Sequence, residues 1–200
     1  MGPVSGAVAA ATPTSTMRII AGEFRGRKLL PPEGDATRPI TDRVKQSLFD
    51  ILAPHLEGAR VYDLFAGTGS MGLECLSRGA GYAAFFEADK SALERLKKNI
   101  TTLKLESRSQ VIPGDVFKWF SNTTNPERAN LIFLDPPYRF LKDHPEKLRK
   151  LAETITRNHL APQGLVIFRH DAQDELELPA LKTIDRREYG AMMLEFLTRS

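Results

Sequence analysis

The segment Asp135-Pro136-Pro137-Tyr138 carries residue types suited to a chemical role. It follows residues 131–134, an apolar run of the kind that forms a strand buried on both faces. Asp135 is therefore expected at the carboxyl end of a strand, where open α/β sheets bind ligands. Proline lacks a backbone N–H and favours an extended conformation at the preceding residue, so a helix is not expected to begin directly after the strand. The backbone carbonyls of the segment are then left without helical hydrogen-bond donors. The segment thus presents hydrogen-bond acceptors beside an aromatic ring.

Such a segment suits the exocyclic amine of a nucleobase, whose lone pair is delocalised into the ring. The Asp135 carboxylate and the Pro136 carbonyl can hold both N–H bonds and aim the lone pair at an electrophilic methyl group. Stacking of Tyr138 on the base is worth roughly 1–3 kcal/mol. Orientation can lower a barrier by roughly 7–11 kcal/mol, so neither a metal nor a covalent nucleophile is required. The candidate catalytic residues are Asp135, Pro136, Pro137 and Tyr138.

A second motif, DLFAGTGSMG, has the pattern GxGxxG at Gly67, Gly69 and Gly72. It follows an expected strand and opens a helix, a context in which glycines allow a ligand close to the backbone and to the helix N-terminus. Glu87 ends the next expected strand, where an acid accepts from the hydroxyls of an adenosine ribose. Together these features predict a nucleoside cofactor.

The glycine loop alone does not separate a dinucleotide from S-adenosylmethionine, because both carry adenosine. Asp63 can place a carboxylate near an amino group, which methionine has and a pyrophosphate lacks. Asp115 can accept from the adenine amine or cap a helix, and both roles stay open. The candidate cofactor-binding residues are Asp63, Phe65, Ala66, Gly67, Thr68, Gly69, Glu87, Asp115 and Val116.

The elements that must position these residues alternate along the chain. Strands are expected at 60–65, 82–87, 109–115, 130–135 and 164–170, with helices after the glycine loop, after Asp89, near 115–120 and over 142–159. This order predicts a doubly wound, largely parallel sheet. Before it, residues 18–30 predict a small hairpin or irregular ribbon, and residues 41–52 an amphipathic helix capped by Thr41. Residues 186–197 can add a terminal strand or hairpin.

Composition narrows the class of protein further. The 200 residues suffice for one well-buried domain, and the net charge of 28 − 25 = +3 with a pI near 9.0 is compatible with a nucleic-acid partner. Cys75 is the only cysteine and the four histidines lack metal-ligand spacing, so we expect neither disulfides nor a metal, and a cytoplasmic location. No apolar stretch approaches the roughly 20 residues of a membrane span.

Several blocks in order carry a resemblance to a known family: MRIIAGEFRGRKL, TRPITDRVKQSLFDIL, DLFAGTGSMGLECLSRGA, FFEAD, LDPPY and REYG. The chain resembles the RsmD family of bacterial small-subunit (16S) ribosomal RNA guanine-N2 methyltransferases over residues 17–197. It departs from the family pattern at Ala21 and Asp50, and at Arg169-His170, where an acid is more usual.

The resemblance implies an α/β, Rossmann-like, seven-stranded class I methyltransferase fold that uses S-adenosyl-L-methionine. It also implies a basic N-terminal ribbon that touches ribosomal RNA, within an assembled small subunit. We expect residues 1–16 to be a disordered extension or a start-site artefact, 17–58 a ribbon and helix packed on the main domain, and 59–200 the methyltransferase domain of a monomer. The candidate RNA-binding residues are Arg18, Arg25, Arg27, Lys28, Arg38 and Arg43.

Three alternatives stay open at the level of sequence. An adenine-N6 methyltransferase acting on DNA or RNA can use the same DPPY segment. A sizeable separate target-recognition region would favour this alternative, and the chain has little room for one. An RNA-binding module with an inactive cofactor pocket is a second possibility. A nicotinamide-dependent dehydrogenase accounts for the glycine loop but leaves DPPY unexplained.

Overall fold

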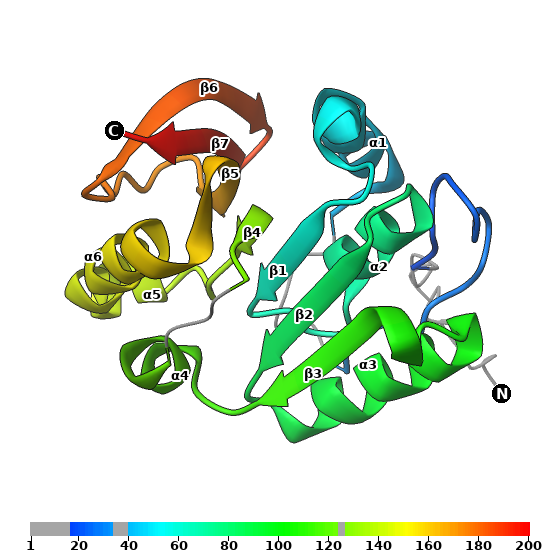
Figure 1. Ribbon diagram of the computed structural model, residues 1–200. Helices are drawn as coiled ribbons and strands as arrows, with labels where there is room; N and C mark the ends of the chain where they lie inside the picture. The colour runs from blue at the N-terminus through cyan, green and yellow to red at the C-terminus, as the bar shows by residue number, and fades with distance from the viewer. Residues whose placement is uncertain (1–16, 34–39, 124–126) are drawn as a thin grey trace, which may run out of the picture.

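A seven-stranded sheet forms the centre of the chain in the computed structural model, which describes residues 17–33, 40–123 and 127–200. The strand order is β3-β2-β1-β4-β5-β7-β6 (Figure 1). The strands are β1 (Arg60–Leu64), β2 (Tyr82–Glu87), β3 (Ser109–Pro113), β4 (Ala129–Leu134), β5 (Leu160–Asp171), β6 (Leu181–Tyr189) and β7 (Met192–Arg199). The first five run parallel, and β7 pairs antiparallel with both β5 and β6. This confirms the expected class I methyltransferase fold.

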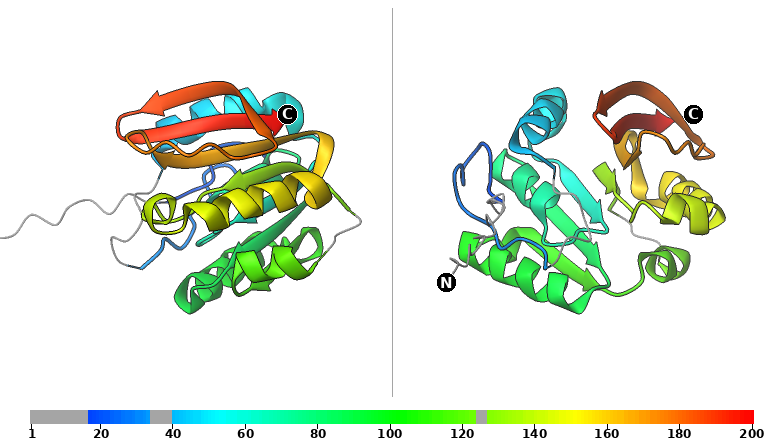
Figure 2. Two further views of the ribbon diagram at one scale, coloured as in Figure 1. Left: turned by 90° about the vertical axis from the view of Figure 1, so that its left-hand side faces the viewer. Right: turned by 180° about the vertical axis from the view of Figure 1, so that it is seen from behind.

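Helices cover both faces of the sheet (Figures 1 and 2). One face carries α1 (Asp42–Leu52), α2 (Ser70–Ser77) and α3 (Lys90–Leu103). The other carries α4 (Val116–Asn122), α5 (Phe140–Asp143) and α6 (Pro145–Thr154). Short helical turns lie at Ala53–His55, Glu106–Arg108 and Ile155–His159. The predicted single helical stretch over 142–159 is thus divided, because Pro145 starts a new helix after α5.

The sheet has a hydrophobic core on each face, which explains why the central strands are apolar along their length and do not alternate between apolar and polar residues. Val61 and Phe133 face α1, α2 and α3, whereas their neighbours Tyr62 and Ile132 face α4 and α6. Successive side chains on a strand point to opposite faces, so a strand covered on both sides needs apolar residues at every position. Because β1 to β5 run parallel, their carboxyl ends lie at the same edge of the sheet.

Residues 17–31, called the ribbon below, form an irregular antiparallel hairpin beside α2. Arg18 and Lys28 make one antiparallel bridge, and Ile19 and Leu29 are buried in the core beneath α1 and α3. The ribbon lies on the face of the sheet that carries α1, α2 and α3, next to α2 and α3 (Figure 1). Its packing in this core gives it a fixed place relative to the glycine loop.

Glu74 of α2 fastens the ribbon to the helices. Its carboxylate is fully buried and accepts from the backbone N–H groups of Ile20 and Ala21 at 2.9 and 3.0 Å. It also pairs with Lys45 of α1 at 2.9 Å and with Arg78 at 2.8 Å. Burial lowers the pKa of Lys45, and the neighbouring Glu74 carboxylate opposes this change. Three separate segments therefore depend on one buried acid.

Candidate functional site

The predicted catalytic and cofactor-binding residues lie along one edge of the sheet, after the carboxyl ends of four adjacent strands. Asp63 is on β1 and the glycine loop follows it, Glu87 ends β2, Asp115 follows β3, and Asp135 follows β4. Parallel register places Asp63 beside Phe133, two residues before Asp135. Segments up to 72 residues apart in the chain therefore meet at one site.

Glu87 holds the glycine loop in place. Its Oε2 accepts from the backbone N–H of Gly67 at 2.6 Å, and its Oε1 accepts from Ala88 and Asp89 at 2.8 Å each. A carboxylate has about four lone-pair sites, so three bonds leave one acceptor position for a ligand hydroxyl. The acid is therefore both a brace for the loop and a candidate ribose ligand.

The two glycines of the loop have different surroundings. Gly67 has a φ of 56° and a Cβ built on it would meet nothing within 4 Å, so its outer side is open. Gly69 has a φ of 88°, and a Cβ there would lie 2.4 Å from Leu96 Cδ1. Gly67 is thus the position that permits close approach of a ligand. A side chain at Gly69 would instead disturb the packing of the loop against Leu96 of α3.

Asp63 is a buried acid directly beneath the glycine loop. Its Oδ2 accepts from the backbone N–H of Gly72 at 2.9 Å. Burial raises the pKa of Asp63 to about 8, and the negative charges of Asp135 and Glu87 add to the effect. A cation beside Asp63 would lower this pKa, so the residue is suited to an ammonium group.

Three phenylalanine rings from separate elements meet next to the glycine loop. The Phe65 ring lies 5.9 Å from Phe117 and 6.0 Å from Phe140, and the last two rings stack at 6.2 Å. Phe65 has a φ of 62°, a left-handed conformation that costs a non-glycine residue about 1–2 kcal/mol. All three side chains are only partly buried, so they offer an aromatic surface to a planar ligand.

The DPPY segment presents two acceptors, and β5 supplies a partner for one of them. Arg169 Nε donates to Asp135 Oδ1 at 2.7 Å, and Arg169 Nη2 lies 2.7 Å from Oδ2. Burial raises the pKa of Asp135, whereas the Arg169 guanidinium opposes this. The Pro137 carbonyl accepts from Phe140, but no N–H in the described part of the chain donates to the Pro136 carbonyl. Tyr138 is half-buried beside them.

The remaining predicted cofactor residues make contacts within the protein. Asp115 caps α4 by accepting from Phe117 N at 2.8 Å, the second of its two open roles. Val116 is buried in the core of the second face. The Thr68 hydroxyl is directed at Met17 Sδ of the ribbon, at 3.4 Å. The Ala66 N–H donates to the Phe86 carbonyl, which joins the loop to β2.

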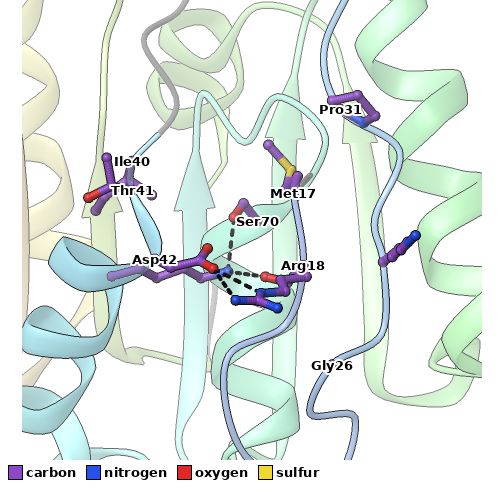
Figure 3. A pocket seen from close by; sticks show the side chains of 10 residues that line it. Met17, Arg18, Gly26, Pro31, Ile40, Thr41, Asp42 and Ser70 are labelled. Carbon is purple, nitrogen blue, oxygen red and sulfur yellow. Dashed lines mark hydrogen bonds and ion pairs between the residues drawn. The ribbon is translucent and has the colours of Figure 1, made fainter. Parts of the chain in front are cut away.

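A pocket of about 510 Å³ opens between the ribbon, the start of α1 and the start of α2. Met17 and Arg18 of the ribbon, Thr41 and Asp42 of α1, and Ser70 line it (Figure 3). Lys45 also lines the pocket, where it donates to Ser70 Oγ at 3.1 Å and to the Arg18 carbonyl at 3.3 Å. Since Ser70 directly follows Gly69, the pocket adjoins the glycine loop.

The basic residues predicted to contact RNA are exposed where the structure describes them. Arg18 is paired with Asp42 at 2.7 Å, so part of its charge is already neutralised. Arg25, Arg27 and Lys28 form no ion pair with any residue in the described ranges. Arg43 is exposed on α1, and Arg38 lies outside the described residues. The ribbon therefore presents three uncompensated cations.

Two groups of residues at the site were not found from the sequence. The pairing of Arg169 with Asp135 could be anticipated only from strand order, since β5 lies next to β4. Phe117 and Phe140 follow Asp115 and DPPY directly, and that adjacency was the available signal.

No group of three or more metal-ligating side chains occurs within residues 17–33, 40–123 and 127–200. Across the same ranges, no helix is long and apolar enough to cross a membrane.

Comparisons with known proteins place the chain among methyltransferases. The family model described as Conserved hypothetical protein 95 matches residues 17–198. YlbH of Bacillus subtilis is 38% identical over 165 residues, which are 82% of this chain and 86% of that protein. Ribosomal RNA small subunit methyltransferase D of Escherichia coli is 42% identical over 123 residues, 62% of this chain and 61% of its own length. The solved structure of yhhF from Escherichia coli has a TM-score of 0.79 at 33% identity, over 92% of this chain and 98% of that one.

Proposed function

Because the chain belongs to the family described as Conserved hypothetical protein 95, the RsmD family, we propose that it methylates the N2 amine of a guanine in small-subunit (16S) ribosomal RNA. The methyl donor is S-adenosyl-L-methionine. The observation that carries the proposal is the position of the Asp135 carboxylate and of the Pro136 carbonyl, to which no N–H of the described residues donates, at the sheet edge that also holds the glycine loop.

The residues around the glycine loop fit this donor. The open side of Gly67 admits a ligand to the backbone, and the remaining lone pair of Glu87 is available to a ribose hydroxyl. The aromatic surface of Phe65, Phe117 and Phe140 suits the adenine ring, and buried Asp63 suits the methionine ammonium group. When bound, the donor supplies an electrophilic methyl group on a sulfonium centre.

The DPPY segment would prepare the amine for attack. Asp135 and the Pro136 carbonyl accept its two N–H bonds, which turns the nitrogen lone pair toward the methyl group. Tyr138 stacks on the guanine and holds it flat. Asp135, as a carboxylate, would also stabilise the positive charge that develops on nitrogen as the new N–C bond forms and the S–C bond of the donor breaks. The methylated amine would then release one proton to solvent, and the donor would leave as a neutral thioether. Catalysis on this view consists of positioning and electrostatics.

The substrate particle and the assembly state extend the proposal. The cations of the ribbon and Arg43 would contact phosphates of ribosomal RNA within an assembled small subunit. The protein would act as a monomer in the cytoplasm. The ribbon lies beside the pocket at Ser70, which supports a single continuous surface from RNA contact to methyl transfer.

The test is incubation with methyl-labelled cofactor and unmethylated small subunits, followed by nucleoside mass spectrometry. N2-methylguanosine in the ribosomal RNA is the expected product. N6-methyladenosine as the product would instead support methylation of the adenine N6 amine. If wild-type protein labels no nucleoside, the proposed activity is refuted. Naked ribosomal RNA as a parallel substrate tests whether the assembled particle is required.

A further inference from the structure

Arg169 of β5 turns its side chain toward the DPPY segment. In the register of β4 with β5, Leu134 lies opposite Phe168, so Asp135, which directly follows β4, is a neighbour of Arg169. The guanidinium makes two bonds of 2.7 Å, one to each carboxylate oxygen. The Asp135 and Arg169 side chains are only 20% and 13% exposed.

A bidentate pair of this kind fixes both the position and the charge of a carboxylate. Two parallel N–H bonds allow a single orientation of the carboxylate plane, whereas one bond leaves it free to rotate. Each carboxylate oxygen has about two lone pairs, so a guanidinium that uses one on each oxygen leaves one on each for another donor. The pair is thus compatible with a substrate amine at the same carboxylate.

We propose that Arg169 is a positioning residue that holds the Asp135 carboxylate ionised and oriented toward the reacting amine. The inference rests on the proposed function and assigns to β5 a role that its sequence alone does not indicate. Arg169 itself does not need to touch the base or the cofactor. Its effect passes entirely through Asp135.

The charge of Asp135 is the sensitive quantity. Burial raises the pKa of this carboxyl, and the Arg169 guanidinium counteracts that effect. The other groups coupled to the pair are Asp63 of β1 and Tyr138, both of which act on Arg169. Without the guanidinium, the pKa of Asp135 would rise further, and the protonated form would offer the amine an O–H donor in place of an acceptor.

Kinetics across a pH series test this role with Arg169→Gln and Arg169→Lys. At neutral pH we expect Arg169→Gln to lower kcat about 10²-fold, the loss typical of a misplaced group, with the cofactor KM unchanged. The acid limb of its kcat profile should move to higher pH, so that alkaline pH restores part of the activity. Lysine keeps the charge but cannot make the two parallel bonds, so the kcat of Arg169→Lys should lie between those of wild type and Arg169→Gln.

The matched control is Arg187→Gln, which removes an arginine from an exposed ion pair with Asp185 on β6. We expect its kcat and pH profile to match wild type. Thermal unfolding of every variant establishes that losses of activity are not losses of fold. A reduction in kcat that is equal at every pH would overturn the proposal, since a merely structural role predicts that result.

A second readout does not depend on activity. Carbon-13 NMR of the aspartate carboxyl groups, with Asp135→Asn to assign the Asp135 signal, follows its titration in wild type and Arg169→Gln. An upward shift of the Asp135 midpoint supports the role, and an unchanged midpoint overturns it. If wild-type protein does not methylate small subunits, the proposed function fails, while this titration still decides whether Arg169 controls the charge of Asp135.

Discussion

Replacement of Glu74 by glutamine should strongly destabilise the protein and release the ribbon. Each carboxylate oxygen of Glu74 accepts two donors: Ile20 N and Lys45 Nζ on one, Ala21 N and Arg78 Nε on the other. An amide nitrogen in place of either oxygen leaves two of these donors without an acceptor. Hydrogen bonds to charged groups are worth about 1.5–3 kcal/mol each, so two lost bonds cost about 3–6 kcal/mol.

An independent estimate agrees with this magnitude. Removing one partner of a buried ion pair costs about 3–5 kcal/mol, because the remaining charge stays buried without compensation. Lys45, whose side chain is only 3% exposed, would lose its buried counter-charge and keep only its hydrogen bonds to Ser70 and to the Arg18 carbonyl. Since domains have a total stability of about 5–15 kcal/mol, Glu74→Gln removes a large part of it.

Equilibrium urea unfolding measures the loss, with Glu94→Gln on the exposed side of α3 as the matched control. The control should change the free energy of unfolding by less than about 0.5 kcal/mol. Amide exchange at Ile20 and Ala21 provides a local readout and should accelerate in Glu74→Gln. A loss below about 1 kcal/mol, without faster exchange, would refute the reasoning, because it is less than a single bond to a charged group contributes.

The other predictions concern the chemistry at the sheet edge and the ribbon. Asp135→Asn should lower kcat about 10²–10³-fold with the affinity for S-adenosylmethionine spared, and near-wild-type turnover would remove the acid from catalysis. Gly67→Ala should weaken calorimetric binding of the cofactor and cost about 1–2 kcal/mol of stability, because its φ is positive. Gly69→Ala should lower the melting temperature further, because its φ is also positive and its Cβ meets Leu96; equal losses of stability would contradict the different surroundings. Because the pKa of Asp63 is raised to about 8, an ammonium group bound beside it should displace a proton below that pH, so cofactor affinity should rise with pH up to about 8. Calorimetry in buffers of different ionisation enthalpy measures the proton release, and an Asp63→Asn variant that behaves like wild type would contradict it. Replacing the ribbon cations Arg25, Arg27 and Lys28 together by alanine should reduce the slope of log affinity against log salt by about two to three units. Filter binding of small subunits across a salt series measures this slope, and an unchanged slope would mean that the three residues are ordinary surface charges.

The sequence by itself determined most of the element order and which residues form the candidate site. Apolar runs of strand length, the cap residues Thr41 and Asp89, and the glycine loop are local signals, and each has its expected place in the structure. The candidate catalytic and cofactor-binding residues lie at or directly after the ends of expected strands. Their common location at one edge could therefore be predicted, because parallel strands share a carboxyl edge.

Only the tertiary structure decided which side chains pair across that edge. Arg169 and Asp135 are 34 residues apart and meet because β5 joins the sheet next to β4, and no local pattern records this order. The role of Glu74 also has no local signal in the sequence, because it arises from the ribbon and α1 packed around the carboxylate. Local preference sets helices and strands, but the charge state of a buried acid depends on neighbours that long-range packing alone supplies.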